Sequence, residues 1–182
     1  MLSRFVSVPI LLTATSFAAW AASPWFAPAA SAPQINPKET EASSVLQLAD
    51  QKLSVAYRTS AWNHEMLARA RGNAGQRDDL NRRLPFLTRA TLSLPFAMQV
   101  GGISLKAGDH PLRFEMNNAG VLVLRVLVDK SFQTFDYVPQ TSPLSFPFLC
   151  MNVVPSEAAD CELVVQWGTE TGRLRMRRSA QR

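Results

Sequence analysis

From residue 86 onward the sequence consists mainly of short stretches in which apolar and polar residues alternate, separated by turn residues. The clearest example is MQVGGISLKAGDH, residues 98–110, where Gly101-Gly102 and Gly108 flank a strand of only three residues. A period of two is typical of a strand with one buried face, and paired glycines allow the positive φ angles of a tight turn. The stretch therefore predicts a β-meander of neighbouring antiparallel strands.

The rest of the chain extends this prediction to an all-β fold. The segments VLQLA (45–49) and KLSVAY (52–57) predict a hairpin, and the apolar stretch 121–128 predicts a central strand. Residues 129–143 show no period and predict the longest loop. About eight or nine short strands with glycine and asparagine turns indicate an antiparallel β-sandwich.

One segment has helical features, and it predicts a small helical insert at about residues 60–84. Its first helix is expected to be capped by Thr59 or Ser60 and to end at Gly72. The buried stripe of that helix is predicted from a spacing of four residues, at Trp62, Met66 and Ala70. A second short helix over QRDDLNRRL is expected to end at Pro85.

The N-terminus has the features of an export signal. Residues 1–32 contain a single arginine, an uncharged apolar run over residues 5–22, and small residues that suit cleavage. The alternative is an uncleaved anchor, because about 20 apolar residues can span a bilayer. Residues 33–43 predict a flexible lead-in, 44–178 the β-sandwich domain and 179–182 a disordered tail. The expected location is periplasmic or secreted.

The order of three segments resembles a known family. KLSVAY, LSLPFAMQVGGISLKAGDHPLRF and LVVQWGTETGRLRM are similar to segments of the secreted bacterial proteins called domain of unknown function 2911. The resemblance covers roughly residues 44–177, and one departure is His110, where that family more often has an aromatic residue. The resemblance implies an exported β-domain and no particular activity.

The sequence offers no motif for catalysis, a metal or a cofactor. The two histidines, His64 and His110, are not part of an H-E-x-x-H motif, and there is no CxxC pair, Gly-x-Ser-x-Gly elbow or P-loop. Asp129 and Asp136 flank the predicted loop and are the basis of an alternative, a hydrolase with a loop-borne site. The net charge of +5 is modest, and nucleic acid is not an expected partner.

Two groups of residues are candidates for a binding surface. One group consists of the outward-facing arginines of the last predicted strand: Arg173, Arg175 and Arg177. The other consists of the aromatic residues of the predicted long loop: Phe132, Phe135 and Tyr137. Arginine side chains suit contact with carboxylate and phosphate groups. The alternative for the arginines is a solvated strand face, and the alternative for the aromatic residues is packing over an open end of the sandwich.

The only cysteines, Cys150 and Cys161, are predicted to form a disulfide, because an even pair in an exported protein usually does so. Alternation places Cys150 on one face with Leu144, Phe146 and Phe148, which is expected to be the core face. The alternative is two buried free thiols.

Together these features predict a non-catalytic binding or structural accessory protein of the bacterial envelope without a cofactor. Its partner is unknown, and an anionic envelope component suits the arginines. Contact with a membrane is expected only through an uncleaved N-terminal segment.

Overall fold

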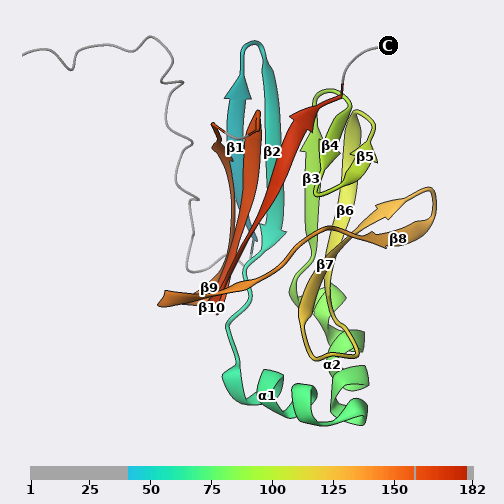
Figure 1. The fold of residues 1–182 in the computed structure, drawn as a ribbon, viewed down its shortest axis with the longest axis vertical. Coiled ribbons are helices and arrows are strands. Elements are labelled where there is room, and N and C mark those ends of the chain that lie inside the picture. Colours follow the sequence, from blue (N-terminus) through green and yellow to red (C-terminus); the bar gives the residue numbers. More distant parts are fainter. Residues whose placement is uncertain (1–40, 158, 180–182) are drawn as a thin grey trace, which may run out of the picture.

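The computed structural model describes residues 41–157 and 159–179, and it shows two antiparallel sheets packed face to face (Figure 1). The prediction of an all-β sandwich with a small helical insert is therefore confirmed, with ten strands and two helices in the described chain. The predicted signal peptide, residues 1–32, lies outside the described residues.

The larger sheet has six strands in the order β1-β2-β3-β6-β7-β8. Their bounds are β1 (Glu41–Leu48), β2 (Gln51–Arg58), β3 (Ala90–Leu94), β6 (Gly108–Met116), β7 (Leu122–Val128) and β8 (Ser131–Thr134). The hairpin of β1 and β2 confirms one prediction. Two others are wrong: β1 already begins at Glu41, inside the expected lead-in, and β8 lies within the expected loop 129–143, where β7 provides a partner for its backbone.

The smaller sheet has four strands in the order β5-β4-β10-β9. Their bounds are β4 (Met98–Val100), β5 (Ile103–Leu105), β9 (Gln140–Pro155) and β10 (Cys161–Arg178). The tight turn between β4 and β5 is confirmed, with φ angles of 48° at Gly101 and 84° at Gly102.

The predicted β-meander is wrong beyond that hairpin. Strands β5 and β6 belong to different sheets, so the chain crosses the sandwich between Leu105 and Gly108. Gly108 has a φ of 126°, which is accessible to glycine and allows this change of direction. A turn signal in the sequence is the same whether the next strand pairs with its neighbour or joins the opposite sheet.

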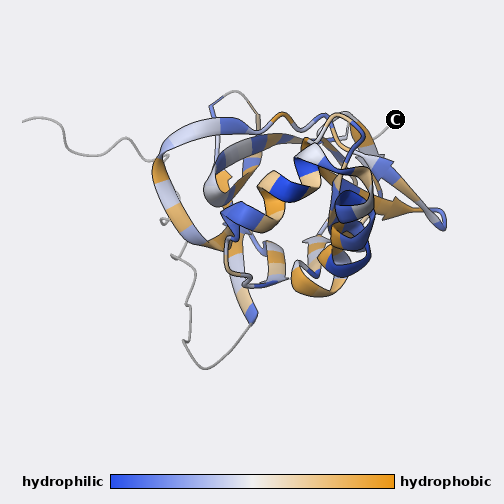
Figure 2. Cartoon of the chain, turned by 90° about the horizontal axis from the view of Figure 1, so that it is seen from below, coloured by the Kyte–Doolittle hydropathy of each residue, from blue (hydrophilic) through white to orange (hydrophobic). Residues whose placement is uncertain are grey.

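The helical insert lies across one end of the sandwich, as Figures 1 and 2 show from two directions. Helix α1 covers His64–Gly72, and its cap is Asn63, whose side chain accepts a hydrogen bond from the Met66 N–H at 2.9 Å. The expected caps Thr59 and Ser60 are wrong, because the chain at Ala61 is still extended and forms a bridge with Phe148.

Helix α2 covers Ala74–Leu87, so it continues beyond the expected end at Pro85. The Thr88 N–H and hydroxyl both donate to the carbonyl of Leu84, which completes the last turn although Pro85 has no N–H to donate. The buried stripe of the insert is formed by Leu67, Ala70, Leu80 and Leu84. Ala70 was predicted, whereas Trp62 precedes α1 and is, like Met66, only partly buried.

The core lies between the sheets and consists of the alternate residues of each strand. Its largest fully buried members from the six-stranded sheet are Leu46, Leu53, Leu92, Phe114, Met116 and Leu124, and those from the four-stranded sheet are Met98, Leu149 and Met151. In β6 the predicted inward face of Leu112, Phe114 and Met116 is confirmed. The expected inward face of β9 is wrong, because Leu149, Met151 and Val153 are the buried residues.

Contacts along the free edge of β9 explain why Leu149, Met151 and Val153 are its inward residues. Its inward residues present their N–H groups to the neighbouring sheet: Leu149 N–H donates to the Ser60 carbonyl at 2.8 Å, and Val153 N–H donates to the Ser44 hydroxyl at 3.1 Å. Between them the Met151 backbone lies close to the hydroxyl of Tyr57. Because buried N–H groups need partners, these contacts hold the second half of β9 against β1 and β2 in one register.

Strand β10 turns back on itself at Gly168. Glu162 and Arg173 lie in direct contact, although a straight strand would separate them by about 36 Å. Gly168 has a φ of 62°, and the pairing with β9 shifts on both sides of it. In Figure 1, β10 runs to the lower edge of the sandwich and returns upward as the red arrow. The two halves of β10 therefore enclose a concave surface.

The predicted disulfide between Cys150 and Cys161 is wrong. Both cysteines are free. Cys161 lies opposite Pro155, and Cys150 lies opposite Gln166, so the two are five positions apart along the ladder. That offset corresponds to about 17 Å, whereas a disulfide requires Cα atoms about 4.4–6.8 Å apart. Cys161 is buried in the core, and the half-buried Cys150 lies 3.9 Å from the Tyr57 hydroxyl.

We expect peptide mapping to find two free thiols. Protein denatured without reductant should incorporate one alkyl group at Cys150 and one at Cys161, because their register keeps the sulfur atoms apart. Before denaturation Cys161 should react far more slowly, since the buried thiol is inaccessible and its pKa is raised to about 12. A linked pair of peptides containing these two cysteines would contradict the observed register.

Candidate functional site

A groove of about 540 Å³ lies on the outer side of the four-stranded sheet. Arg173, Arg175 and Arg177 line it from the returning half of β10, because they alternate with Leu174 and Met176, which are fully buried. The predicted outward arginine face is thus confirmed, and the bend at Gly168 makes that face part of a concave surface.

Strand β4 forms the next wall of the groove. Gln99 lies directly across from Arg177 in the ladder and is exposed, whereas its neighbours Met98 and Val100 are buried. The Gly101 N–H donates to the Arg175 carbonyl at 3.0 Å, which continues the pairing beyond the strand. Gln99 therefore adds amide donors and an acceptor beside the guanidinium groups.

The segment between β8 and β9 closes the groove at its side. The Asp136 N–H donates to the Gly101 carbonyl at 2.9 Å, and Tyr137 N–H donates to the Phe135 carbonyl at 2.8 Å. These bonds form a tight turn that holds Asp136 in the lining of the groove. Val138 and Gln140 follow and also line it.

Phe135 and Tyr137 do not form a binding surface, so this prediction is wrong. Both are buried, and Tyr137 packs directly on Gly172, where an added Cβ would lie 2.1 Å from its ring. Phe135 packs beside Gly101 and Leu174. Both residues are instead packed aromatics, and the burial of their large rings stabilises the sandwich. Burial also raises the pKa of the Tyr137 hydroxyl.

Carboxylates neutralise the arginines of the groove only in part. Glu162 is nearly buried and accepts from Arg173 at 3.0 Å and from the Ser156 hydroxyl at 3.1 Å. Arg175 forms no ion pair with any residue that the structure describes. Three arginines therefore face two carboxylates, those of Glu162 and Asp136, and the lining has a net positive charge.

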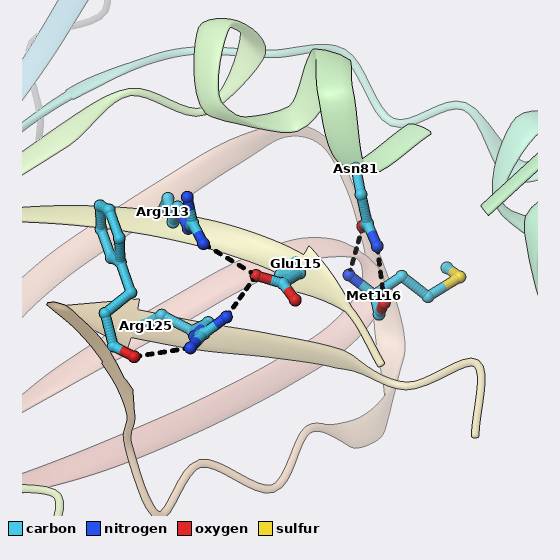
Figure 3. Close-up of polar contacts among 6 residues, drawn as sticks. Asn81, Arg113, Glu115, Met116 and Arg125 are labelled. Carbon is cyan, nitrogen blue, oxygen red and sulfur yellow. Dashed lines mark hydrogen bonds and ion pairs between the residues drawn. The ribbon is translucent and has the colours of Figure 1, made fainter. Parts of the chain in front are cut away.

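The third candidate aromatic, Phe132, belongs to a second charged cluster, on the outer face of the six-stranded sheet. The Arg113 guanidinium lies 3.8 Å from the centre of its ring. Glu115 accepts from Arg113 at 3.1 Å and from Arg125 at 2.6 Å, while Arg125 also donates to the Phe132 carbonyl (Figure 3). Phe132 packs against the Arg113 guanidinium, so we assign it a packing role, although the Nε atoms of Arg113 and Arg125 are buried without a hydrogen-bond partner in the described chain.

The same close-up shows how the insert is attached to this sheet. The Asn81 side chain of α2 donates to the Met116 carbonyl at 2.9 Å and accepts from the Met116 N–H at 2.7 Å (Figure 3). This paired contact satisfies the last residue of β6 and fixes α2 against it.

The remaining chemical candidates lie apart from the groove. His64 is exposed at the start of α1, and His110 lies on β6 with its Nε2 2.8 Å from the Lys106 carbonyl. Asp129 occupies the turn between β7 and β8, where its φ is 46°. Within the described ranges, no group of three or more His, Cys, Asp and Glu side chains is placed to hold a metal ion.

Sequence reasoning missed several contributors to the groove. Glu162 shares its face of β10 with Arg173 only because the strand turns back, and Gln99 becomes a neighbour of Arg177 only through long-range pairing. The available signal was the alternation of CELVV and MQV, which already places both side chains on an outer face.

Comparison with known proteins found no matching family model, no curated protein and no solved structure. The resemblance to domain of unknown function 2911 therefore stays a prediction. In the part of the chain that the structure describes, no helix combines the length and apolar character needed to cross a membrane.

Proposed function

We propose that this protein is an exported, non-catalytic binding protein of the bacterial envelope, and that its groove holds an anionic ligand. The observation that carries the proposal is the row formed by Arg173, Arg175 and Arg177 along one wall of a concave surface. Arginine donates in a planar fork that matches carboxylate and phosphate groups. The export signal expected in residues 1–32 supports the location.

The composition of the groove supports binding over catalysis. A hydrolase needs a group that transfers a proton, and neither His64 nor His110 lines the groove. The two carboxylates that do line it are Asp136 and Glu162, and both oxygens of Glu162 already accept hydrogen bonds. The arginines, in contrast, are exposed side chains along one wall of the groove.

The test is binding of polygalacturonate, a soluble polymer of carboxylates, by a variant with Arg173→Gln, Arg175→Gln and Arg177→Gln. We expect at least about tenfold weaker binding at low salt, because three positive charges are removed from one wall. Unfolding free energy should change little at Arg175 and Arg177, by about 0.5 kcal/mol or less for each exposed site. The loss should be larger at Arg173, because its removal leaves the nearly buried Glu162 carboxylate without its ion pair.

The matched control carries the same change in charge on the helices: Arg69→Gln, Arg82→Gln and Arg83→Gln, three exposed arginines outside the groove. It should bind polygalacturonate within about twofold of the unmodified protein, apart from the general effect of net charge. Equal binding by the two triple variants, or no binding by the unmodified protein, would refute the proposal.

A further inference from the structure

Next to the arginine groove, the chain exposes large apolar side chains in one continuous stretch. Val138, Leu144 and Phe148 are exposed by 70%, 65% and 51%. Only two other large hydrophobic residues in the described ranges are comparably exposed, Phe86 on α2 and Val121 in the turn before β7. Three of these five thus lie within eleven consecutive residues, so exposed apolar side chains are concentrated in this stretch.

This apolar stretch begins inside the groove itself. Val138 and Gln140 line the groove together with the arginines, and Gln140 pairs with Thr171 of β10, which also lines it. Leu144 and Phe148 follow four and eight residues later on β9, on the part of the strand that precedes its contacts with β1 and β2. The chain therefore runs from the positive groove directly into the exposed apolar residues of β9.

The stretch presents side chains, and it is poorly suited to pairing with another strand. Pro143 and Pro147 lie within it and lack N–H groups. The Pro147 carbonyl already accepts from the Trp62 N–H at 2.8 Å. Because proline on an edge strand prevents strand addition, the exposed apolar groups rather than the backbone are left to contact a partner.

We propose that the anionic ligand of the groove is the surface of a lipid membrane that contains acidic phospholipids. The inference rests on the proposed function and names the ligand class for the same site. Arg175 and its neighbours would contact headgroup phosphates, while Val138, Leu144 and Phe148 enter the boundary of the acyl chains. The strength of membrane binding increases with the buried apolar area and with the attraction of positive charge to acidic lipids. A soluble polyanion, in contrast, offers no partner for the exposed apolar residues.

The experiment measures co-sedimentation of the full chain with lipid vesicles. One vesicle type contains equal parts of phosphatidylglycerol and phosphatidylcholine, and the other contains phosphatidylcholine alone. The variant carries Leu144→Ser and Phe148→Ser, which changes side chains that are already exposed. We expect its partition to the acidic vesicles to fall by about tenfold, while its binding of polygalacturonate stays within about twofold.

The matched control carries Phe86→Ser and Val121→Ser, two exposed apolar residues outside the stretch, and should partition as the unmodified protein does. Equal partition of both serine variants, together with arginine-dependent binding of polygalacturonate, would overturn the membrane inference and leave the proposed function intact. If the arginine variant still binds polygalacturonate normally, both fail.

A second copy of the chain is the other occupant that the stretch could accommodate, and analytical ultracentrifugation of the same proteins tests it. A dimer of the unmodified protein that dissociates in the Leu144→Ser and Phe148→Ser variant would assign the stretch to self-association. That result would also overturn the membrane inference. A monomer in both cases, with reduced partition to acidic vesicles, supports it.

Discussion

Replacing Gly168 with alanine is expected to lower the free energy of unfolding by about 3 kcal/mol. The residue has a φ of 62°, which costs an L-residue roughly 1 kcal/mol. An added Cβ would lie 2.0 Å from the Trp62 ring, which packs on the glycine and against Trp167. Displacing that ring adds about 2 kcal/mol. Urea unfolding followed by tryptophan fluorescence measures the loss.

Gly72→Ala is the control for this substitution. Gly72 is the last residue of α1 and has no neighbouring atom within 4 Å of an added Cβ, so stability should stay constant or rise by less than about 1 kcal/mol. A Gly168→Ala protein as stable as the Gly72→Ala protein would show that the bend of β10 does not depend on glycine. Because the bend brings Arg173 to Glu162, the alanine variant should also bind polygalacturonate more weakly.

The folded protein should lose stability steeply in alkaline solution, and Cys161 should cause the first part of the loss. Burial, with the nearby carboxylates of Asp160 and Glu162, raises the pKa of this thiol from about 9 to about 12. Above pH 9 the unfolded chain releases the proton while the folded chain keeps it. Unfolding is therefore favoured by about 1.4 kcal/mol for each pH unit between 9 and 12.

Below pH 9 both states hold the proton, and the thiol contributes no pH dependence. Tyr57 and Tyr137 have pKa values that burial raises too, and they add to the loss mainly above pH 10. Urea unfolding at pH 8, 9 and 10 should thus show a decline between pH 9 and 10 that is smaller in a Cys161→Ala variant. An equal decline in the variant would assign the effect to other groups.

Local patterns were sufficient to predict much of the fold. Alternation identified the β1–β2 hairpin, the inward face of β6 and the outward arginines of β10, because each depends only on whether successive side chains point to one side. The Gly101-Gly102 turn was predictable for a similar reason, since positive φ angles select glycine at those positions.

The predictions that failed depend on which strand lies beside which. Alternation places Leu144, Phe146, Phe148 and Cys150 together, but it does not say which face is buried. Contacts of Leu149 and Val153 with Ser60 and Ser44 decide that, and these partners are about 90 to 110 residues away in the chain. The same contacts leave Leu144 and Phe148 exposed, whereas the register of β9 with β10 keeps the two cysteines apart.

Local sequence patterns were enough for the fold class, the two sides of most strands and the outward arginines of β10. The turn of β10 at Gly168, the placement of Glu162 and Gln99 beside those arginines, and the burial of Phe135 and Tyr137 depend on tertiary contacts. Side-chain period is a local property of an extended chain. Concavity, register and burial of the second face arise from pairing between distant segments, which no local pattern specifies.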